Sequence, residues 1–256
     1  MFIRMLSIIL LSIILLQFPQ IARAEKITLA SLDYVPFSSP DLPENGFLAV
    51  IATEAFKRAG YDLEIVYVPW KRALTGSKAG NYDGILGAFR TPEREQYFYY
   101  SKAVSKLDNV FVYLGDGMTT TAVIKAAIVG VIRGSSLYGD LKENDFFSVT
   151  EVDSYEQGLK MVVGGRMKAM LIDRILFSYQ VNNDDVLKKH AAQFAAISPP
   201  FSSNPLYILV SRKHPDGAKI VAAFNAAYVE MSEDGSLGLI MSRFGLRELS
   251  VPPEGS

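Results

Sequence analysis

The stretch Ile128-Val129-Gly130-Val131-Ile132-Arg133-Gly134-Ser135-Ser136, halfway along the chain, decides the fold. Its first five residues predict a buried strand, Gly134 predicts a turn, and the two hydroxyl side chains are typical of a helix start. The same order of strand, turn and helix has already occurred within residues 27–114. A second βα series therefore begins here, and we expect an α/β protein.

Outward from this stretch, apolar and amphipathic segments alternate along the whole chain. In the first series we expect strands at 27–31, 63–68, 84–89 and 110–114, and helices at 47–59, at 70–78 and from Thr91-Pro92. In the second we expect strands at 128–132, 148–152, 169–172, 194–197 and 206–210, and helices after Ser136, at 154–163, from Asp173 and at 217–231, with 236–244 closing the chain. Open sheets of this kind bind ligands beyond the carboxyl ends of their strands, and two lobes side by side also place a cleft between them.

The first 24 residues have the features of a secretory signal peptide. Arg4 supplies a positive start, residues 5–16 form an apolar run, and Ala22-Arg23-Ala24 is a typical cleavage pattern. The run is too short for a spanning helix, which needs roughly 20 residues; an uncleaved anchor is the alternative. We therefore expect cleavage after Ala24 and export to the periplasm.

Composition excludes several classes of protein. The chain has no Cys and two His, which rules out disulfides, thiolate nucleophiles and a His-rich metal site. Without Arg4 and Arg23, 24 basic and 27 acidic side chains leave a net charge of −3. Since nucleic acids and anionic membranes require a cationic surface, neither is an expected partner.

Arg94 has an unfavourable place at an otherwise well-formed helix start. Thr91 suits the N-cap, Pro92 the first helical position and Glu93 the positive end of the helix. A cation in the first turn opposes the helix dipole by up to about 1 kcal/mol. Arg94 is better explained if it faces an anion, such as a carboxylate held by two parallel hydrogen bonds. The alternative is a surface arginine paired with Glu93 or Glu95.

Other candidate ligand contacts lie at strand ends of the second series. Ser135 and Ser136 offer donors to an anion, or else they cap a helix. Asp173 ends a strand and opens a helix, where an open sheet places ligand contacts; its alternative role is also an N-cap. Three aromatic side chains are either ring platforms for a ligand or core residues: Tyr34, Phe37 and Trp70.

Several segments in a fixed order carry a family resemblance: Tyr34-Val35-Pro36-Phe37, Gly80-Asn81-Tyr82-Asp83-Gly84, Thr91-Pro92-Glu93-Arg94, Tyr100-Ser101, residues 129–136, Gly165-Arg166 with Asp173, and Glu233-Asp234-Gly235. The chain resembles the extracellular solute-binding proteins of family 3, the amino-acid-type receptors of ABC importers. The resemblance implies a two-lobed periplasmic-binding-protein type II fold, with an open mixed sheet flanked by helices in each lobe and the ligand cleft between them. Lobe 1 would contain residues 25–114 and 201–256, and lobe 2 residues 115–200.

The resemblance also implies roles for single residues. Arg94 would hold the α-carboxylate of the ligand, and Asp173 its α-ammonium group. The remaining contacts would be two aromatic rings and two hydroxyls, from Tyr34, Trp70, Ser135 and Ser136.

The segment before Arg94 departs from the family pattern. Members that bind amino acids usually have a cluster of Ser or Thr there, whereas this chain has Gly87-Ala88-Phe89-Arg90, one residue shorter. Phe89 cannot donate a hydrogen bond, and Arg90 adds a second cation. The implied ligand is a larger amino acid derivative, a dicarboxylate or some other small anion.

The sequence therefore predicts a monomeric periplasmic protein that captures a small polar solute, an amino acid or a related small carboxylate, by hinge closure and delivers it to an ABC permease in the inner membrane. It implies no catalytic residue, no metal and no cofactor. One alternative is a periplasmic dehydratase of the cyclohexadienyl type on the same fold, with Arg90 and Arg94 holding two carboxylates. The other is a ligand receptor that feeds a signalling protein.

Overall fold

The computed structural model describes residues 24–115, 124, 126–143 and 148–244. Apart from Ala24, the predicted signal peptide lies outside the described residues. Within the described ranges, no helix is both long enough and apolar enough to cross a membrane.

The strands of the described residues are β1 (Glu25–Ser31), β2 (Tyr61–Tyr67), β3 (Gly84–Phe89), β4 (Phe98–Leu114), β5 (Ile128–Ile132), β6 (Ser148–Val152), β7 (Ala169–Asp173), β8 (Phe194–Ala196) and β9 (Ser202–Ser211). They form one mixed sheet in the order β2-β1-β3-β9-β4-β7-β5-β6, with β8 paired to β4. β1 pairs in parallel with β2 and β3, and β5 pairs in parallel with β6 and β7. The two parallel regions are the two βα series expected from the sequence.

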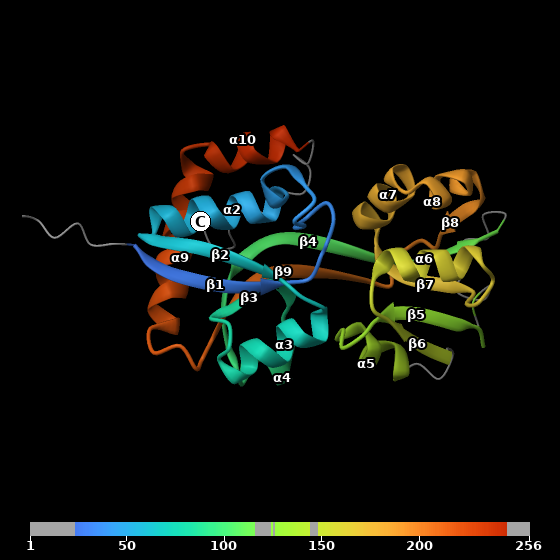
Figure 1. The fold of residues 1–256 in the computed structure, drawn as a ribbon, viewed down its shortest axis with the longest axis horizontal. Coiled ribbons are helices and arrows are strands. Elements are labelled where there is room, and N and C mark those ends of the chain that lie inside the picture. Colours follow the sequence, from blue (N-terminus) through green and yellow to red (C-terminus); the bar gives the residue numbers. More distant parts are fainter. Residues whose placement is uncertain (1–23, 116–123, 125, 144–147, 245–256) are drawn as a thin grey trace, which may run out of the picture.

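Two groups of elements are visible in Figure 1, each with helices on both faces of its part of the sheet. The first group contains β1–β3 with η1 (Pro43–Asn45), α2 (Phe47–Arg58), α3 (Trp70–Ala79), α4 (Pro92–Glu95), α9 (Gly217–Glu233) and α10 (Ser236–Arg243). The second contains β5–β8 with α5 (Leu137–Lys142), α6 (Tyr155–Val163), α7 (Arg174–Asn183), α8 (Asp185–Lys189) and η3 (Ala191–Gln193). The two-lobed α/β architecture predicted from the sequence is thus present.

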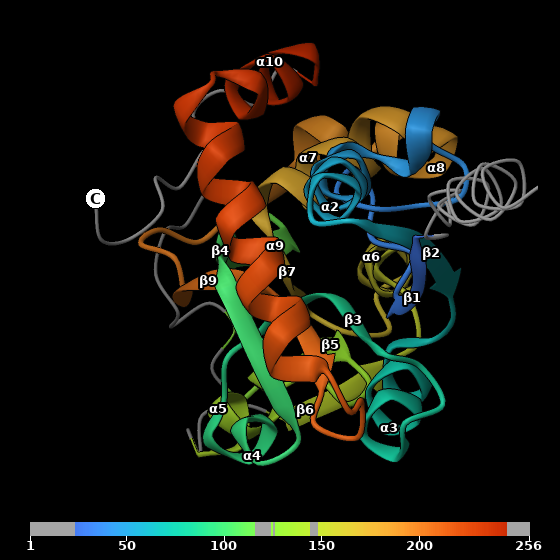
Figure 2. The same ribbon diagram turned by 90° about the vertical axis from the view of Figure 1, so that its left-hand side faces the viewer.

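The two groups are joined by β4 and β9, which are longer than the sequence predicted. β4 pairs with β9 from Phe98 to Asn109 and then with β7 from Asn109 to Tyr113. Only residues 110–114 and 206–210 were predicted as strands, because polar residues and two register shifts in the first part of β4 disrupt the expected alternation. α9 packs across both strands, as Figure 2 shows. Continuous strands between two bodies allow them to bend relative to each other.

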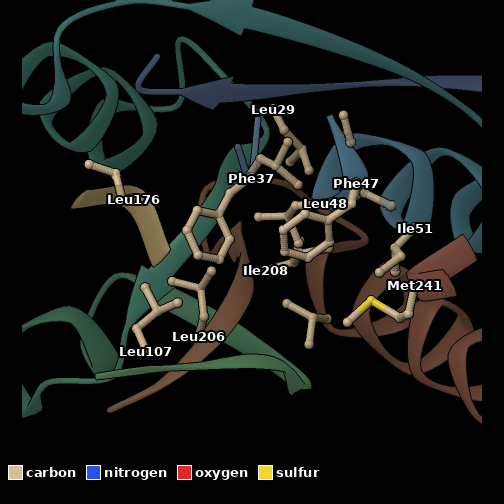
Figure 3. Close-up of a cluster of buried hydrophobic side chains, with 14 of the residues drawn as sticks. Leu29, Phe37, Phe47, Leu48, Ile51, Leu107, Leu176, Leu206, Ile208 and Met241 are labelled. Atoms are coloured by element: carbon tan, nitrogen blue, oxygen red, sulfur yellow. The ribbon is translucent and has the colours of Figure 1, made fainter. Parts of the chain in front are cut away.

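The main hydrophobic core packs against Tyr34, one of the candidate site residues. Phe47, Leu48 and Ile51 on one face of α2 pack with buried side chains of β1 and β9, among them Leu29 and Ile208 (Figure 3). Phe37, one of the candidate ring platforms, is fully buried in this cluster and stacks on Tyr34 with ring centroids 4.8 Å apart. Tyr34 is thereby held in place by the core.

Candidate functional site

A cavity of about 480 Å³, including its open mouth, lies between the two groups of elements. The first group and β9 line it with Ser31, Leu32, Tyr34, Trp70, Leu86, Gly87, Ala88, Phe89, Arg94 and Leu206, and the second group with Ile132, Ser135, Ser136 and Tyr155. The predicted ligand contacts are eight when Phe89 and Arg90, from the segment before Arg94, are included. Six of them are in this lining: Tyr34, Trp70, Phe89, Arg94, Ser135 and Ser136. The other two, Arg90 and Asp173, are not.

Arg94 is buried at the cavity, with 3% of its surface exposed. Thr91 caps the short α4, since its Oγ1 accepts a hydrogen bond from the Arg94 N–H at 3.2 Å. Nη1 of Arg94 donates to the Phe89 carbonyl at 2.9 Å, and the guanidinium carbon lies 5.2 Å from the centre of the Trp70 ring. Burial lowers the pKa of Arg94.

The guanidinium of Arg94 has no carboxylate within ion-pair distance among the described residues. A buried cation without a counterion is unfavourable, because burial removes its hydration without replacing it. Neither Glu93 nor Glu95 forms an ion pair with Arg94, since Glu93 pairs with Lys78 and Glu95 with Arg90. The charge of Glu93 offsets the burial of Arg94 only in part, because the pKa of Arg94 is still lowered. Of the two alternatives for Arg94, the geometry therefore favours an anion in the cavity over a surface ion pair.

Trp70 connects the two groups across the cavity. It is the first residue of α3, and its indole Nε1 donates a hydrogen bond to the Gly134 carbonyl at 3.0 Å. Gly134 has φ of +77° in the turn after β5, a conformation that favours glycine. A second hydrogen bond fixes the turn, because the Gly134 N–H donates to Glu151 Oε1 at 2.9 Å.

The two serines after Gly134 have different surroundings. Ser135 Oγ accepts a hydrogen bond from the Leu137 N–H at 3.2 Å and so supports the start of α5. Ser136 precedes α5 without a side-chain capping bond. The Ser135 hydroxyl only accepts in this bond, so the O–H groups of both serines can donate to a molecule in the cavity.

Tyr34 and Tyr155 meet across the cavity with ring centroids 5.7 Å apart. Burial raises the pKa of both hydroxyls. Tyr155 is not among the residues predicted from the sequence. It lies in the first turn of α6, after Ser154, whose hydroxyl caps the helix by accepting from the Gln157 N–H. A tyrosine in a first helical turn has no distinctive sequence pattern.

Asp173 lies outside the cavity lining and is 1% exposed. Its Oδ1 accepts from the N–H groups of Ile175 at 2.9 Å and Leu176 at 3.1 Å, which makes it the N-cap of α7. Its Oδ2 accepts from the Asp108 N–H on β4 at 3.0 Å. Burial outweighs these hydrogen bonds and raises the pKa of Asp173 to about 6. The predicted contact with an ammonium group remains a prediction, and the capping alternative is present in the structure.

Arg90 does not line the cavity. More than half of its side chain is exposed, its Nε forms an ion pair with Glu95 Oε1 at 2.5 Å, and its guanidinium carbon lies 5.2 Å from the centre of the Tyr100 ring. The structure therefore brings one of the two predicted cations, Arg94, to the cavity.

The segment before Arg94 has an irregular backbone at Gly87. The pairing of β3 with β9 shifts between Leu86 and Ala88, which leaves Gly87 as the extra residue of a β-bulge. Its φ is +88°, and an added Cβ would lie 3.1 Å from a methyl group of Leu48. Gly87 and its neighbours in β3 line the cavity, and this part of the lining is called the β3 wall.

Within the described ranges, no group of three or more His, Cys, Asp or Glu side chains is arranged to hold a metal ion. The polar chemistry of the cavity consists of one guanidinium, serine hydroxyls, two phenols and backbone groups. Such a set recognises a solute by hydrogen bonds and charge.

The chain belongs to the bacterial extracellular solute-binding proteins, family 3, whose model matches residues 27–247. It is 25% identical over 215 residues to the arginine-binding extracellular protein ArtP of Bacillus subtilis (strain 168), covering 81% of this chain and 80% of ArtP. Among solved structures, Tv2483 bound to L-arginine superposes with a TM-score of 0.76 at 19% identity, over 88% of this chain and 93% of Tv2483. A histidine kinase sensor domain with similarity to periplasmic binding proteins superposes with a TM-score of 0.75 at 13% identity, over 90% of this chain and 99% of that domain. At these identities the two structures support the fold alone.

Proposed function

We propose that this chain is a periplasmic receptor that binds a small carboxylate-bearing solute in the cavity. The observation that carries the proposal is Arg94, a buried guanidinium beside the cavity with no carboxylate partner among the described residues. A guanidinium binds a carboxylate with two parallel, charge-assisted hydrogen bonds, which would supply the missing counterion. Arginine, which gives ArtP its description and is bound in the Tv2483 structure, also carries a carboxylate, which supports this class of solute.

Binding would proceed by closure of two lobes, residues 25–114 with 201–256 and residues 115–200. Contacts across the cavity support this motion: the Trp70 indole reaches the Gly134 carbonyl, and Tyr34 meets Tyr155. A solute that touches both sides binds the closed arrangement better than the open one, so it shifts the population toward closure. β4 and β9 would bend to permit it.

The closed receptor would deliver its solute to an ABC permease in the inner membrane. Membership of the extracellular solute-binding family supports this step, and the signal peptide expected over residues 1–24 would supply export. Crosslinking of the receptor in its native inner membranes, followed by mass spectrometry, tests it. If the crosslinked partner is a permease, delivery is supported. If it is a sensor kinase, the receptor serves signalling and the delivery proposal is wrong.

Solute binding itself is tested by thermal melting in the presence of small acids and their neutral counterparts. The panel contains amino acids, 2-oxo acids and simple carboxylic acids, each paired with its primary amide. Acids are expected to raise the melting temperature of the wild type, their amides are not, and Arg94→Ala is expected to lose the response. If no acid stabilises the protein, or if amides stabilise it equally, the carboxylate assignment is wrong.

A further inference from the structure

The charge of the cavity lining is unbalanced. Among the described residues that line it, Arg94 is the only one with a charged side chain. The other polar side chains are the serines and two tyrosines, Tyr34 and Tyr155. A carboxylate in this cavity finds a cation, but an ammonium group finds no carboxylate. An ammonium group loses its hydration on burial, and without a charged partner that loss is not offset.

Asp173, the nearest candidate partner for an ammonium group, is already engaged. Both its oxygens accept backbone hydrogen bonds, from Asp108 on one side and from Ile175 and Leu176 on the other. Its charge adds to the raised pKa of Tyr34 and Tyr155, which line the cavity, whereas Asp173 itself does not. Since Asp173 is 1% exposed and does not line the cavity, a ligand there has no direct contact with its carboxylate.

A second negative charge on the ligand has no partner either. Arg90, the other cation of the segment, is tied to Glu95 and lies over the Tyr100 ring outside the lining. A dicarboxylate would therefore bury one carboxylate without a counterion. The cavity suits a single negative charge.

The rest of the lining is apolar or aromatic. Apolar side chains of β3, β5 and β9 line the cavity, together with the rings of Trp70 and Phe89. Such a surface favours an apolar or planar group on the ligand, because burial removes that group from water.

From these observations we infer that the ligand is a monocarboxylate with an apolar or aromatic body and no ammonium group, such as a 2-oxo acid or an aryl-alkanoic acid. The inference rests on the proposed function and narrows it. Arg94 would bind the carboxylate, the hydroxyls of Ser135 and Ser136 would donate to it or to a neighbouring oxo group, and the apolar wall would hold the body.

Calorimetric titration of the wild type with matched pairs tests this inference. Phenylpyruvate is compared with L-phenylalanine, and 4-methyl-2-oxopentanoate with L-leucine; each pair differs in the replacement of an oxo group by an ammonium group. The deaminated acid 3-phenylpropanoate and L-arginine complete the set. We expect each ammonium-free acid to bind roughly tenfold or more tightly than its amino acid, because the unpaired ammonium group must be desolvated.

The outcomes separate the inference from the proposed function. If an amino acid binds as tightly as its oxo acid or more tightly, the inference is overturned while carboxylate binding stands. If no acid of either kind binds, both fail. The variant Asp173→Asn provides a second readout on the preferred acid: its affinity should stay within about threefold of the wild type. A loss of L-arginine affinity in that variant, with L-arginine the tightest ligand, would assign Asp173 the ammonium role instead.

Discussion

Arg94 and Asp173 occupy similar places on opposite sides of the cleft. Each is in the first turn or at the cap of a helix that follows a strand, and each is almost completely buried. Their partners differ. Within the described part of the chain, the Arg94 side chain donates one hydrogen bond, to the Phe89 carbonyl, whereas the two oxygens of Asp173 accept three from backbone N–H groups.

We propose that Arg94 is a binding residue and that Asp173 has a structural role. A charged side chain whose hydrogen bonds are complete within the protein gains little from a ligand. Burial penalises both charges, since it lowers the pKa of Arg94 and raises that of Asp173. Arg94 lines the cavity, where a ligand of opposite sign can contact it, and Asp173 does not. Position in the βα pattern thus indicates where ionic side chains lie, and the cavity lining indicates which of them a ligand can contact.

The largest expected effect is that of Arg94→Ala on solute affinity. Removal of a charge-assisted bidentate contact should cost about 2–5 kcal/mol, which is roughly a 30-fold loss or more. Arg94→Lys should not restore binding, because lysine lacks the planar pair of donors. Calorimetric titration with the best acid of the panel measures both variants. An unchanged dissociation constant for Arg94→Ala would remove Arg94 from the site.

The next effect is on stability, and it comes from Asp173. Its folded-state pKa of about 6 lies above its ordinary value of 3.8, so the folded protein holds this proton more tightly than the unfolded chain does. The stability that this provides is present below about pH 4 and is lost as the pH rises toward about 6. The difference corresponds to about 2–3 kcal/mol.

Denaturant unfolding of the wild type and Asp173→Asn at a series of pH values isolates this contribution, since all other titrating groups are shared. The free energy of unfolding of the wild type, minus that of the variant, should fall between pH 4 and 6.5. A difference that is independent of pH, or that rises, would show that the carboxyl group of Asp173 is hydrated and accessible.

A smaller effect is expected for Trp70→Phe, which keeps a ring but removes the donor to the Gly134 carbonyl. A neutral hydrogen bond contributes about 0.5–1.5 kcal/mol, and this one joins the two groups of elements. Affinity for the solute should fall by about 2–10-fold, because closure is less favourable. Equal affinities for the variant and wild type would mean that this contact does not form in the bound state.

The smallest effect is expected for Arg90→Gln, the matched control for Arg94. Exposed ion pairs contribute about 0–1 kcal/mol, and Arg90 lies outside the cavity lining. Stability and solute affinity should both remain close to those of the wild type. A loss as large as that of Arg94→Ala would place Arg90 at the ligand and favour the dicarboxylate chemistry of the dehydratase alternative.

Much of the fold could be predicted from local patterns. The strands expected at 84–89, 128–132 and 148–152 have those bounds in the structure, because apolar runs bounded by turn residues are local signals. The first part of β4 could not be predicted, since its pairing with β9 depends on residues about a hundred positions away. The short helix Asp185–Lys189 was missed because it follows α7 almost directly, with Asp184 as the only boundary.

The candidate site could also be predicted only in part. Arg94 could be identified from a local conflict, a cation at the positive end of a helix. The state of Asp173 could not, because one of its partners is the Asp108 N–H, 65 residues earlier in the chain. Nor could the sequence reveal that one residue of the 87–90 segment is a bulge, which depends on the register of β3 against β9.

The most direct test is a crystal structure of the protein with the tightest-binding acid of the panel. We expect the carboxylate of the acid within hydrogen-bond distance of the Arg94 guanidinium, its apolar body against the β3 wall, and Asp173 still accepting the Asp108 N–H. A ligand whose charged group contacts Asp173 instead, or one bound outside the cavity with Arg94 unpaired, would contradict the assignment of Arg94 as the anchor and Asp173 as a structural residue.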